Sequence, residues 1–185
     1  YDGGIYPPAF RGKVIAPNSL HNVVWVSELH GDASGFRTID EANLLESGDR
    51  WFRPVFSGVG PDGCVYLADW YDTRLSHVRP VDDWHKASGR IYRIKPADAA
   101  PAHRLGDLAE MKGPELLGLL EHPNRWVRRR AVLEIGWQNK RALVPSLVKK
   151  VWAKAGQVSL EALWALSLLK GLRNDLANEW LNHPD

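Results

Sequence analysis

The chain has 185 residues, of which 44% are hydrophobic and 25% are charged, which is the composition of a soluble globular protein with one or two domains. A formal net charge of +2 gives no ground for a nucleic-acid partner. The single cysteine, Cys64, excludes an internal disulfide, a cysteine-ligated zinc site and a Cys-x-x-Cys-His haem attachment within these residues. No apolar run is long enough for a transmembrane segment.

The first half of the chain has the pattern of a β-sheet. Residues 14–16 and 23–26 are rich in β-branched and aromatic side chains, and the Pro17-Asn18-Ser19 turn between them predicts a hairpin. Residues 54–56 and 65–68 predict a second hairpin, because Gly60-Pro61-Asp62-Gly63 is typical of a tight turn. Residues 90–94 alternate polar and apolar side chains, as a half-buried strand does. We therefore expect a β domain over residues 1–95.

The second half has helical spacing. A Pro/Ala/Asp-rich linker is expected over residues 96–113. In the fourth expected helix, Ser159 is placed as the N-cap and Gly171 as the stop, with Leu160, Leu163 and Trp164 on one face. The helices are expected at residues 114–122, 125–135, 144–153, 159–169 and 174–182.

The helices form a repeat. Three pairs of apolar residues are separated by the same interval: Leu116 and Leu147, Leu120 and Val151, and Ala131 and Ala162. Helical pairs of this kind bury their faces by stacking, so we expect truncated HEAT-like repeats over residues 114–185. The chain is then a fragment of a longer protein. Its nine tryptophans are expected mainly to fill gaps in packing, with Trp126 between repeats.

Five motifs in the first half resemble a known family. They are Trp51-Phe52-Arg53-Pro54-Val55, Gly60-Pro61-Asp62-Gly63, Asp69-Trp70-Tyr71-Asp72, Ser76-His77 and Ser88-Gly89-Arg90-Ile91-Tyr92-Arg93-Ile94. Together they resemble large planctomycete and verrucomicrobial proteins described as membrane-bound dehydrogenases. That family is similar to the quinoprotein sugar dehydrogenases in its β-propeller, which is joined to HEAT repeats and commonly to a C-terminal cytochrome c domain.

The resemblance covers roughly residues 5–95 and implies a fold, a location and cofactors. The implied fold is a mixed β and α multidomain protein, with the C-terminal blades of a β-propeller followed by an α-α HEAT-repeat solenoid. The implied location is periplasmic, secreted or in the cell envelope. The implied cofactors are pyrroloquinoline quinone and calcium, with haem c outside this chain.

The resemblance also implies site residues. Arg53 matches an arginine that faces the cofactor carboxylates, a role that suits the bidentate, permanently charged guanidinium. The family's second arginine, two residues earlier, is Trp51 here. The family's catalytic histidine lies in an earlier blade, so the catalytic residues of this chain are unknown and the fragment alone is expected to be inactive. The structural alternative for Arg53 is stacking on Trp51 or Trp70 and pairing with Asp69.

Asp69, Asp72 and His77 are the other candidates. Asp69 and His77, with Arg53, are expected to bind a cofactor, and Asp69 and Asp72 to bind a metal, since carboxylates bind hard cations and all three side chains can orient a hydroxyl or move a proton. The alternative is that the two aspartates bond the backbone of a turn and His77 packs against a strand. His21, in the earlier turn, is a weaker candidate for the same site.

Three functions remain open. The leading hypothesis is an oxidoreductase for carbohydrate-like alcohols that passes electrons to a cytochrome c domain. The alternative is a non-enzymatic scaffold whose propeller binds glycans or proteins and whose HEAT repeats bind a protein partner. The third is calcium-assisted hydrolysis of a sugar or lactone, for which Asp69 and Asp72 are the evidence.

Overall fold

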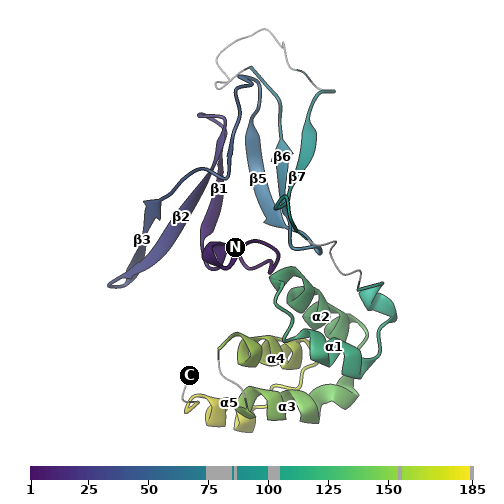
Figure 1. Ribbon diagram of the computed structural model, residues 1–185. Coiled ribbons are helices and arrows are strands. Elements are labelled where there is room, and N and C mark those ends of the chain that lie inside the picture. Colours follow the sequence, from purple (N-terminus) through teal and green to yellow (C-terminus); the bar gives the residue numbers. More distant parts are fainter. Residues whose placement is uncertain (74–84, 86, 100–104, 154–155, 184–185) are drawn as a thin grey trace, which may run out of the picture. The chain divides into compact units, whose positions relative to one another are not determined.

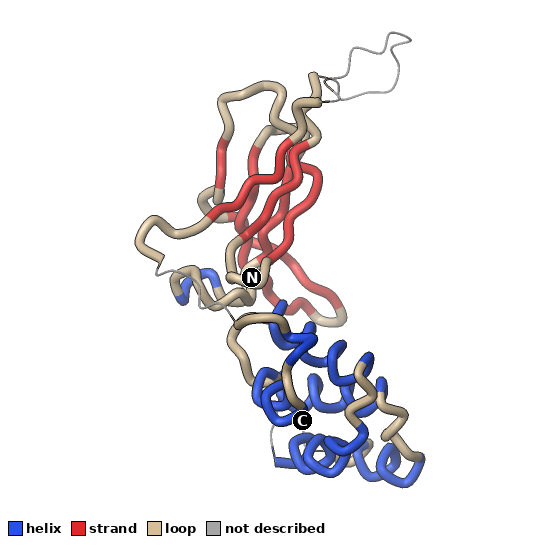
Figure 2. Tube along the Cα trace, turned by 90° about the vertical axis from the view of Figure 1, so that its right-hand side faces the viewer, coloured by secondary structure: helices blue, strands red, loops and turns tan. Residues whose placement is uncertain are grey.

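The computed structural model describes the chain except for residues 74–84, 86, 100–104, 154–155 and 184–185. The chain divides into two compact units, Tyr1–Ala102 (the sheet unit) and His103–Asp185 (the helical unit). Among the described residues the sheet unit contains two antiparallel sheets and the helical unit five α-helices (Figures 1 and 2). The expected mixed β and α architecture is therefore present. No helix in the described ranges is long and apolar enough to cross a membrane.

The first sheet is built around a long central strand. Strand β2 (Val23–Asp32) pairs antiparallel with β1 (Val14–Asn18) on one side. On its other side it pairs with β3 (Gly35–Asp40) and, through its first two residues, with β4 (Leu45–Glu46). The sequence pattern missed β3, because all six of its residues are exposed and it therefore lacks an alternating apolar face.

The first hairpin turn lies later than expected. Pro17 and Asn18 belong to β1, and the turn occupies residues 19–22. The side chain of Asn18 accepts hydrogen bonds from the backbone N–H groups of Leu20 and His21, and Asn22 adopts a φ of 60°. Asparagine is suited to both roles, since its side chain mimics a backbone turn and it tolerates the left-handed region.

The second sheet has the order β5-β6-β7, with β5 at Pro54–Val59, β6 at Val65–Asp69 and β7 at Arg90–Ile94. Its strands are antiparallel, and the predicted Gly60–Gly63 turn joins β5 to β6. The expectation that β7 is half-buried is wrong: Ile91 is 78% exposed, and Ile94 packs against the core. The reason is that β7 is the edge strand, and that Ile91 and Tyr92 are neighbours whose side chains point to opposite faces.

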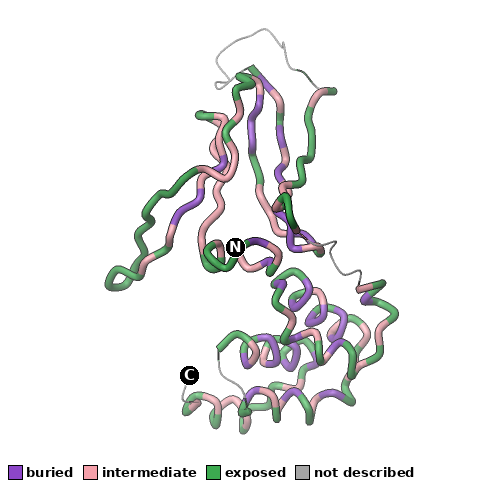
Figure 3. Tube along the Cα trace, in the orientation of Figure 1, coloured by how far each residue is buried: buried purple, intermediate pink, exposed green. Residues whose placement is uncertain are grey.

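The two sheets meet through their first strands, β1 and β5 (Figure 1). Ser57 Oγ donates to the carbonyl of Ile15 at 3.1 Å, and Ser19 Oγ donates to the carbonyl of Pro54 at 2.7 Å. The shared core is apolar and includes residues from the sheets and from the N-terminal segment: Tyr6, Val24, Phe52, Val65 and Leu67. Figure 3 shows buried segments in both sheets.

The N-terminal segment, with the short 3₁₀ helix η1 (Pro8–Phe10), is bonded to the second sheet. Tyr1 Oη donates to the carbonyl of Gly63 at 2.7 Å, and Tyr6 Oη donates to the carbonyl of Ile94 at 2.8 Å. The rings of Tyr1 and Tyr6 stack with centroids 4.6 Å apart. The first residues therefore belong to the sheet unit.

A partly buried carboxylate stabilises the β5–β6 turn. Asp62 accepts hydrogen bonds from the backbone N–H of Cys64 at 3.0 Å, from Tyr66 Oη at 3.0 Å and from Arg93 Nε at 2.6 Å. Burial alone would raise the pKa of Asp62, but these hydrogen bonds outweigh it and the pKa is lowered. Such a carboxyl contributes stability above its unfolded pKa of about 4 and loses that contribution as the pH falls through the lower folded value.

We expect Asp62→Asn to unfold less steeply in acid than the unchanged chain, because the neutral amide takes up no proton on unfolding. The measurement is an acid titration below about pH 4 followed by near-ultraviolet circular dichroism. Asp32→Asn, at the exposed end of β2, is the matched control and should follow the unchanged chain. Identical acid transitions in all three proteins would contradict the assignment.

The helical unit consists of paired helices. Helix α1 (Gly113–Leu119) packs on α2 (Arg125–Trp137), α3 (Val144–Ala153) packs on α4 (Gln157–Leu168), and α2 also packs on α4. Helix α5 (Asn174–Trp180) follows. Two 3₁₀ turns complete the unit: η3 (Arg141–Leu143) precedes α3, and η2 (Leu108–Glu110) lies in the segment expected as a linker and buries Leu108 in the helical core. All five expected helices are present, with their ends shifted by up to three residues.

The repeat interval marks equivalent core positions. Both members of each predicted pair are buried in one cluster, together with other leucines and Ile135: Leu116 and Leu147, Leu120 and Val151, and Ala131 and Ala162. The interval therefore reflects packing, and it relates α1 to α3 and α2 to α4.

The predictions for α4 are partly wrong. The helix begins at Gln157, after Gly156 with a φ of 63°, and Ser159 lies within its first turn, where its Oγ donates to the carbonyl of Val151 at 3.0 Å. At the other end Leu169 is the C-cap, and Lys170, not Gly171, adopts the left-handed conformation.

The predicted apolar face of α4 is wrong for two of its three residues. Leu163 packs against the core, but Leu160 and Trp164 are exposed, whereas Ala162, Ala165 and Leu166 are buried. The small alanines face the core because they let α2 and α4 approach closely.

Most of the tryptophans are exposed as well. Of the eight that the structure describes, five are exposed, namely Trp70, Trp126, Trp137, Trp152 and Trp164. The expectation that they mainly fill gaps is wrong for these five.

Candidate functional site

One end of the second sheet brings together three of the predicted site residues. Arg53 precedes β5, Asp69 ends β6, and Asp72 follows shortly after. The backbone ladder continues past the strands, because Trp70 N–H donates to the carbonyl of Arg53 and Asp72 N–H donates to the carbonyl of Trp51, both at 2.9 Å. His77, the fourth predicted residue, lies outside the described residues.

The β1–β2 turn reaches the same place. Ser19 bonds to Pro54, and the side-chain amide of Asn22 donates to the carbonyl of Phe52. His21 in this turn is exposed, and its Nδ1 lies 3.2 Å from Asn18 Oδ1. Its observed contacts are those of a turn residue.

Asp69 has two different oxygens. Oδ1 accepts from the backbone N–H groups of Arg53 at 2.8 Å and Tyr71 at 2.9 Å, which is the turn-stabilising role expected as the alternative. Oδ2 is buried and has no hydrogen-bond partner among the described residues. Since buried polar atoms in proteins are nearly always satisfied, this oxygen marks a place for a water or a ligand.

Arg53 has the complementary feature. The residue is only 7% exposed, and Nη1 donates to the carbonyl of Phe52 at 3.1 Å. Its Nε is buried and lacks a partner within the described ranges. The side-chain ion pair with Asp69 that was considered for this arginine is not formed in the described structure, where the bond to Asp69 comes from the Arg53 backbone.

Asp72 and an aromatic group complete this end of the sheet. Asp72 is buried, and its Oδ2 accepts from Trp70 Nε1 at 3.3 Å. The rings of Trp51 and His85 pack edge to face, with their centroids 3.9 Å apart. The ring centroids of Trp51 and Tyr71 are 5.7 Å apart. Sequence reasoning missed this aromatic group, because its members come from separate loops with no shared spacing.

The predicted metal site finds no further ligands in the structure. Within the described residues, no group of three or more His, Cys, Asp and Glu side chains is placed to hold a metal ion. Asp69 Oδ1 already accepts two backbone bonds. Calcium binding by Asp69 and Asp72 stays a prediction.

The unpartnered atoms define the ligand chemistry that this site suits. Arg53 Nε is a donor and Asp69 Oδ2 is an acceptor, and the two residues are bonded to each other through the Arg53 backbone. A hydroxyl group can accept from the first and donate to the second. A carboxylate can satisfy only the arginine and is repelled by the aspartate. Water or a neutral, hydroxyl-bearing ligand can therefore satisfy each of the two atoms.

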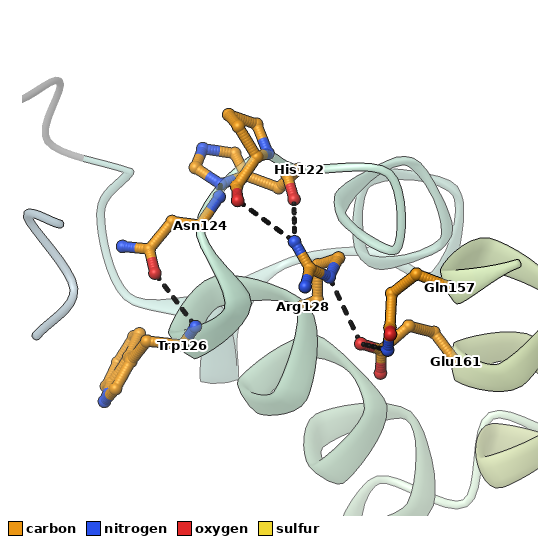
Figure 4. Close-up of polar contacts among 7 residues, drawn as sticks. His122, Asn124, Trp126, Arg128, Gln157 and Glu161 are labelled. Atoms are coloured by element: carbon orange, nitrogen blue, oxygen red, sulfur yellow. Dashed lines mark hydrogen bonds and ion pairs between the residues drawn. The ribbon is translucent and has the colours of Figure 1, made fainter. Parts of the chain in front are cut away.

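A second buried polar cluster lies in the helical unit (Figure 4). Arg128 of α2 and Glu161 of α4 form an ion pair with an Nε–Oε1 distance of 3.2 Å. Arg128 Nη1 also donates to the carbonyls of His122 at 2.8 Å and Pro123 at 3.0 Å, and Gln157 Nε2 donates to Glu161 Oε1 at 2.9 Å. These contacts join α2 to α4, so the cluster is a structural one.

His122 also has a structural role beside this cluster. Its Nδ1 accepts from the backbone N–H of Asn124 at 3.0 Å. Burial lowers the pKa of His122, and the nearby Arg128 charge acts in the same direction. A lowered pKa favours the neutral imidazole, which is the form that accepts at Nδ1.

Comparison with known proteins gives a family for this two-unit chain. Residues 1–98 match the model of a domain of unknown function, DUF7133. The match covers more than half of the chain, and the chain belongs to the DUF7133 family. No curated protein and no solved structure matches it.

Proposed function

We propose that the chain is part of a propeller-type oxidoreductase that acts on carbohydrate-like alcohols, and that Arg53 and Asp69 bind a substrate hydroxyl. The observation that carries the proposal is the pair of buried, unpartnered atoms, Arg53 Nε and Asp69 Oδ2. The nearby rings of Trp51 and Tyr71 supply the apolar surface on which the faces of sugar rings pack.

The fold supports the proposal in two ways. Each sheet contains an antiparallel meander of three strands, as propeller blades do, and the first strands of the two sheets lie side by side. The helix pairs bury equivalent residues at a constant interval, as HEAT repeats do. We therefore assign the two sheets to neighbouring blades and the helices to a solenoid.

The quinone cofactor of the family that the sequence resembles fits Arg53 but not the two aspartates beside it. Arg53 would hold a carboxylate of pyrroloquinoline quinone, and the quinone would supply the two-electron oxidation. Asp69 and Asp72 are both buried nearby, and their charges oppose a ligand with several carboxylates. The described residues therefore favour the alcohol over the quinone. In this proposal haem c lies outside this chain, in a protein of the cell envelope.

The test is a titration of the chain with a panel of monosaccharides and sugar alcohols, followed by ligand-observed NMR. We expect Arg53→Ala to weaken binding at least about tenfold, because it removes a charge-assisted hydrogen bond worth about 1.5 kcal/mol or more. Arg90→Ala is the matched control, since Arg90 is an exposed arginine at the same end of the sheet whose guanidinium bonds to Ser88 and Gly89. Binding to Arg90→Ala should be unchanged.

Two outcomes would contradict the proposal. One is that no saccharide or sugar alcohol binds, and the other is that Arg53→Ala binds as tightly as the unchanged chain. A parallel titration with pyrroloquinoline quinone and calcium separates the two roles of Arg53. Quinone binding that the substitution weakens would assign Arg53 to the cofactor instead of the substrate.

A further inference from the structure

Helix α2 presents an exposed stripe of large side chains. Trp126, Leu133 and Trp137 are spaced seven and four residues apart, which places them on the same side of the helix together with Arg130. Their exposed fractions lie between 37% and 63%. The opposite side of the helix, with Val127, Ala131 and Ile135 among others, is buried in the core.

Helix α4 presents a second stripe. Leu160, Trp164 and Leu168 follow one another at intervals of four residues and are 44–48% exposed. Trp164 occupies the repeat position of Leu133, and Leu168 that of Trp137. Leu168 lies against Gly136 of α2, next to Trp137 in the chain, where an added Cβ would lie 2.9 Å from Cβ of Leu168.

These residues form one surface, which we call the tryptophan–leucine face: Trp126, Leu133, Trp137, Leu160, Trp164 and Leu168. Single exposed apolar side chains are normal on proteins, but six of them on two helices that pack against each other mark an interaction surface. Tryptophan and leucine at the same positions of successive repeats extend the face along the helical unit. Packing of the unit's own core does not require them, since that core is formed by the other sides of α2 and α4.

The charges around the face have one sign. Helices α2 and α4 are described in full, and their exposed charged residues are Arg125 and Arg129, while Arg130 is half-buried. Arg130 lies over the ring of Trp137, with its Cζ 4.9 Å from the ring centroid. Both acidic residues of the two helices are buried and paired, Glu134 with Arg130 at 2.6 Å and Glu161 with Arg128.

We infer that the tryptophan–leucine face binds an acidic amphipathic peptide segment of a partner protein. The apolar side chains of such a segment pack on the tryptophans and leucines, and its carboxylates pair with Arg125 and Arg129. A second copy of this chain is disfavoured, since it would bring two basic faces together. A glycan is disfavoured too, because leucines offer no hydrogen bonds to its hydroxyls.

The test is a selection of displayed random 16-residue peptides on the 185-residue chain, followed by fluorescence-polarisation titrations of the enriched peptides. We expect the enriched peptides to have bulky apolar residues at helical spacing and a net negative charge. Trp164→Ala and Leu133→Ala should each weaken binding at least about tenfold, as central anchors do. Arg125→Glu combined with Arg129→Glu should weaken it as well, with a reduced dependence on salt.

Trp152→Ala is the matched control, because Trp152 is an equally exposed tryptophan on α3 that contacts His183. Circular dichroism shows whether each variant keeps its fold. The inference is overturned if the enriched peptides are basic, or if they bind Trp164→Ala as tightly as the unchanged chain. It is also overturned if the chain instead binds glycans on an array, or associates with itself, and Trp164→Ala abolishes that binding. It does not depend on the saccharide site of the sheet unit, whose variants should leave peptide binding unchanged.

Discussion

Replacing Glu161 with alanine is expected to lower the free energy of unfolding of the helical unit by about 3–5 kcal/mol. The reason is the state in which the substitution leaves Arg128. This residue is only 5% exposed, and its guanidinium would remain in the protein interior without the Glu161 carboxylate. Removing one member of a buried ion pair costs far more than the pair itself contributes, because an isolated charge is poorly solvated there.

The matched control replaces both charges, with Arg128→Met and Glu161→Leu in one protein. We expect this variant to recover most of the lost stability, since no charge stays buried. A residual cost of about 1–3 kcal/mol remains, because the carbonyls of His122 and Pro123 lose their donor. Denaturant unfolding with hydrogen exchange of α2 and α4 measures both variants. A cost below about 1 kcal/mol for Glu161→Ala would mean that water reaches Arg128.

Leu67→Ala is expected to destabilise the sheet unit by about 3–5 kcal/mol. Leu67 lies on the central strand β6 and is fully buried, so alanine leaves a cavity among Val24, Phe52 and Val65. The cost combines the lost transfer free energy of the side chain with that of the cavity. Ile91→Ala on the neighbouring strand is the control, because Ile91 is mostly exposed and its truncation should cost less than about 0.5 kcal/mol.

Hydrogen exchange, measured separately for peptides from each part of the chain, distinguishes the destabilisation by Leu67→Ala from that by Glu161→Ala. The sheet core and the helical core are separate clusters. Leu67→Ala should therefore reduce protection in β1, β5 and β6 and leave α2 and α4 protected. Equal loss of protection in both units would show that they unfold together.

The sequence predicted best those elements whose signal is local. The Gly60-Pro61-Asp62-Gly63 turn is where its residue types place it, because Gly63 supplies a positive φ and Pro61 presets the turn. Strand β7 and helix α3 have the predicted bounds. The repeat interval identified core residues because stacked helices bury the same positions each time.

Tertiary effects account for what the sequence did not reveal. The face of α4 was assigned from the helical spacing of its large apolar side chains, whereas close helix packing buries the alanines and leaves Trp164 outside. Glu161 looks like a solvated helix residue until α2 places Arg128 beside it. At the candidate site, the motif singled out Arg53 and Asp69. Their unpartnered atoms became visible only when the neighbouring strands fixed which oxygens and nitrogens were already bonded.

The bond from Tyr6 to Ile94 has a consequence for the order of folding. It joins residues 88 positions apart and so connects the two ends of the sheet unit. A contact of such long sequence separation forms slowly, because most of the intervening chain must be ordered first. During synthesis, at roughly 5–20 residues per second, the sheet unit cannot complete its packing until Ile94 has left the ribosome. The helical unit relies on contacts between nearby helices, and so it can fold soon after its own residues emerge.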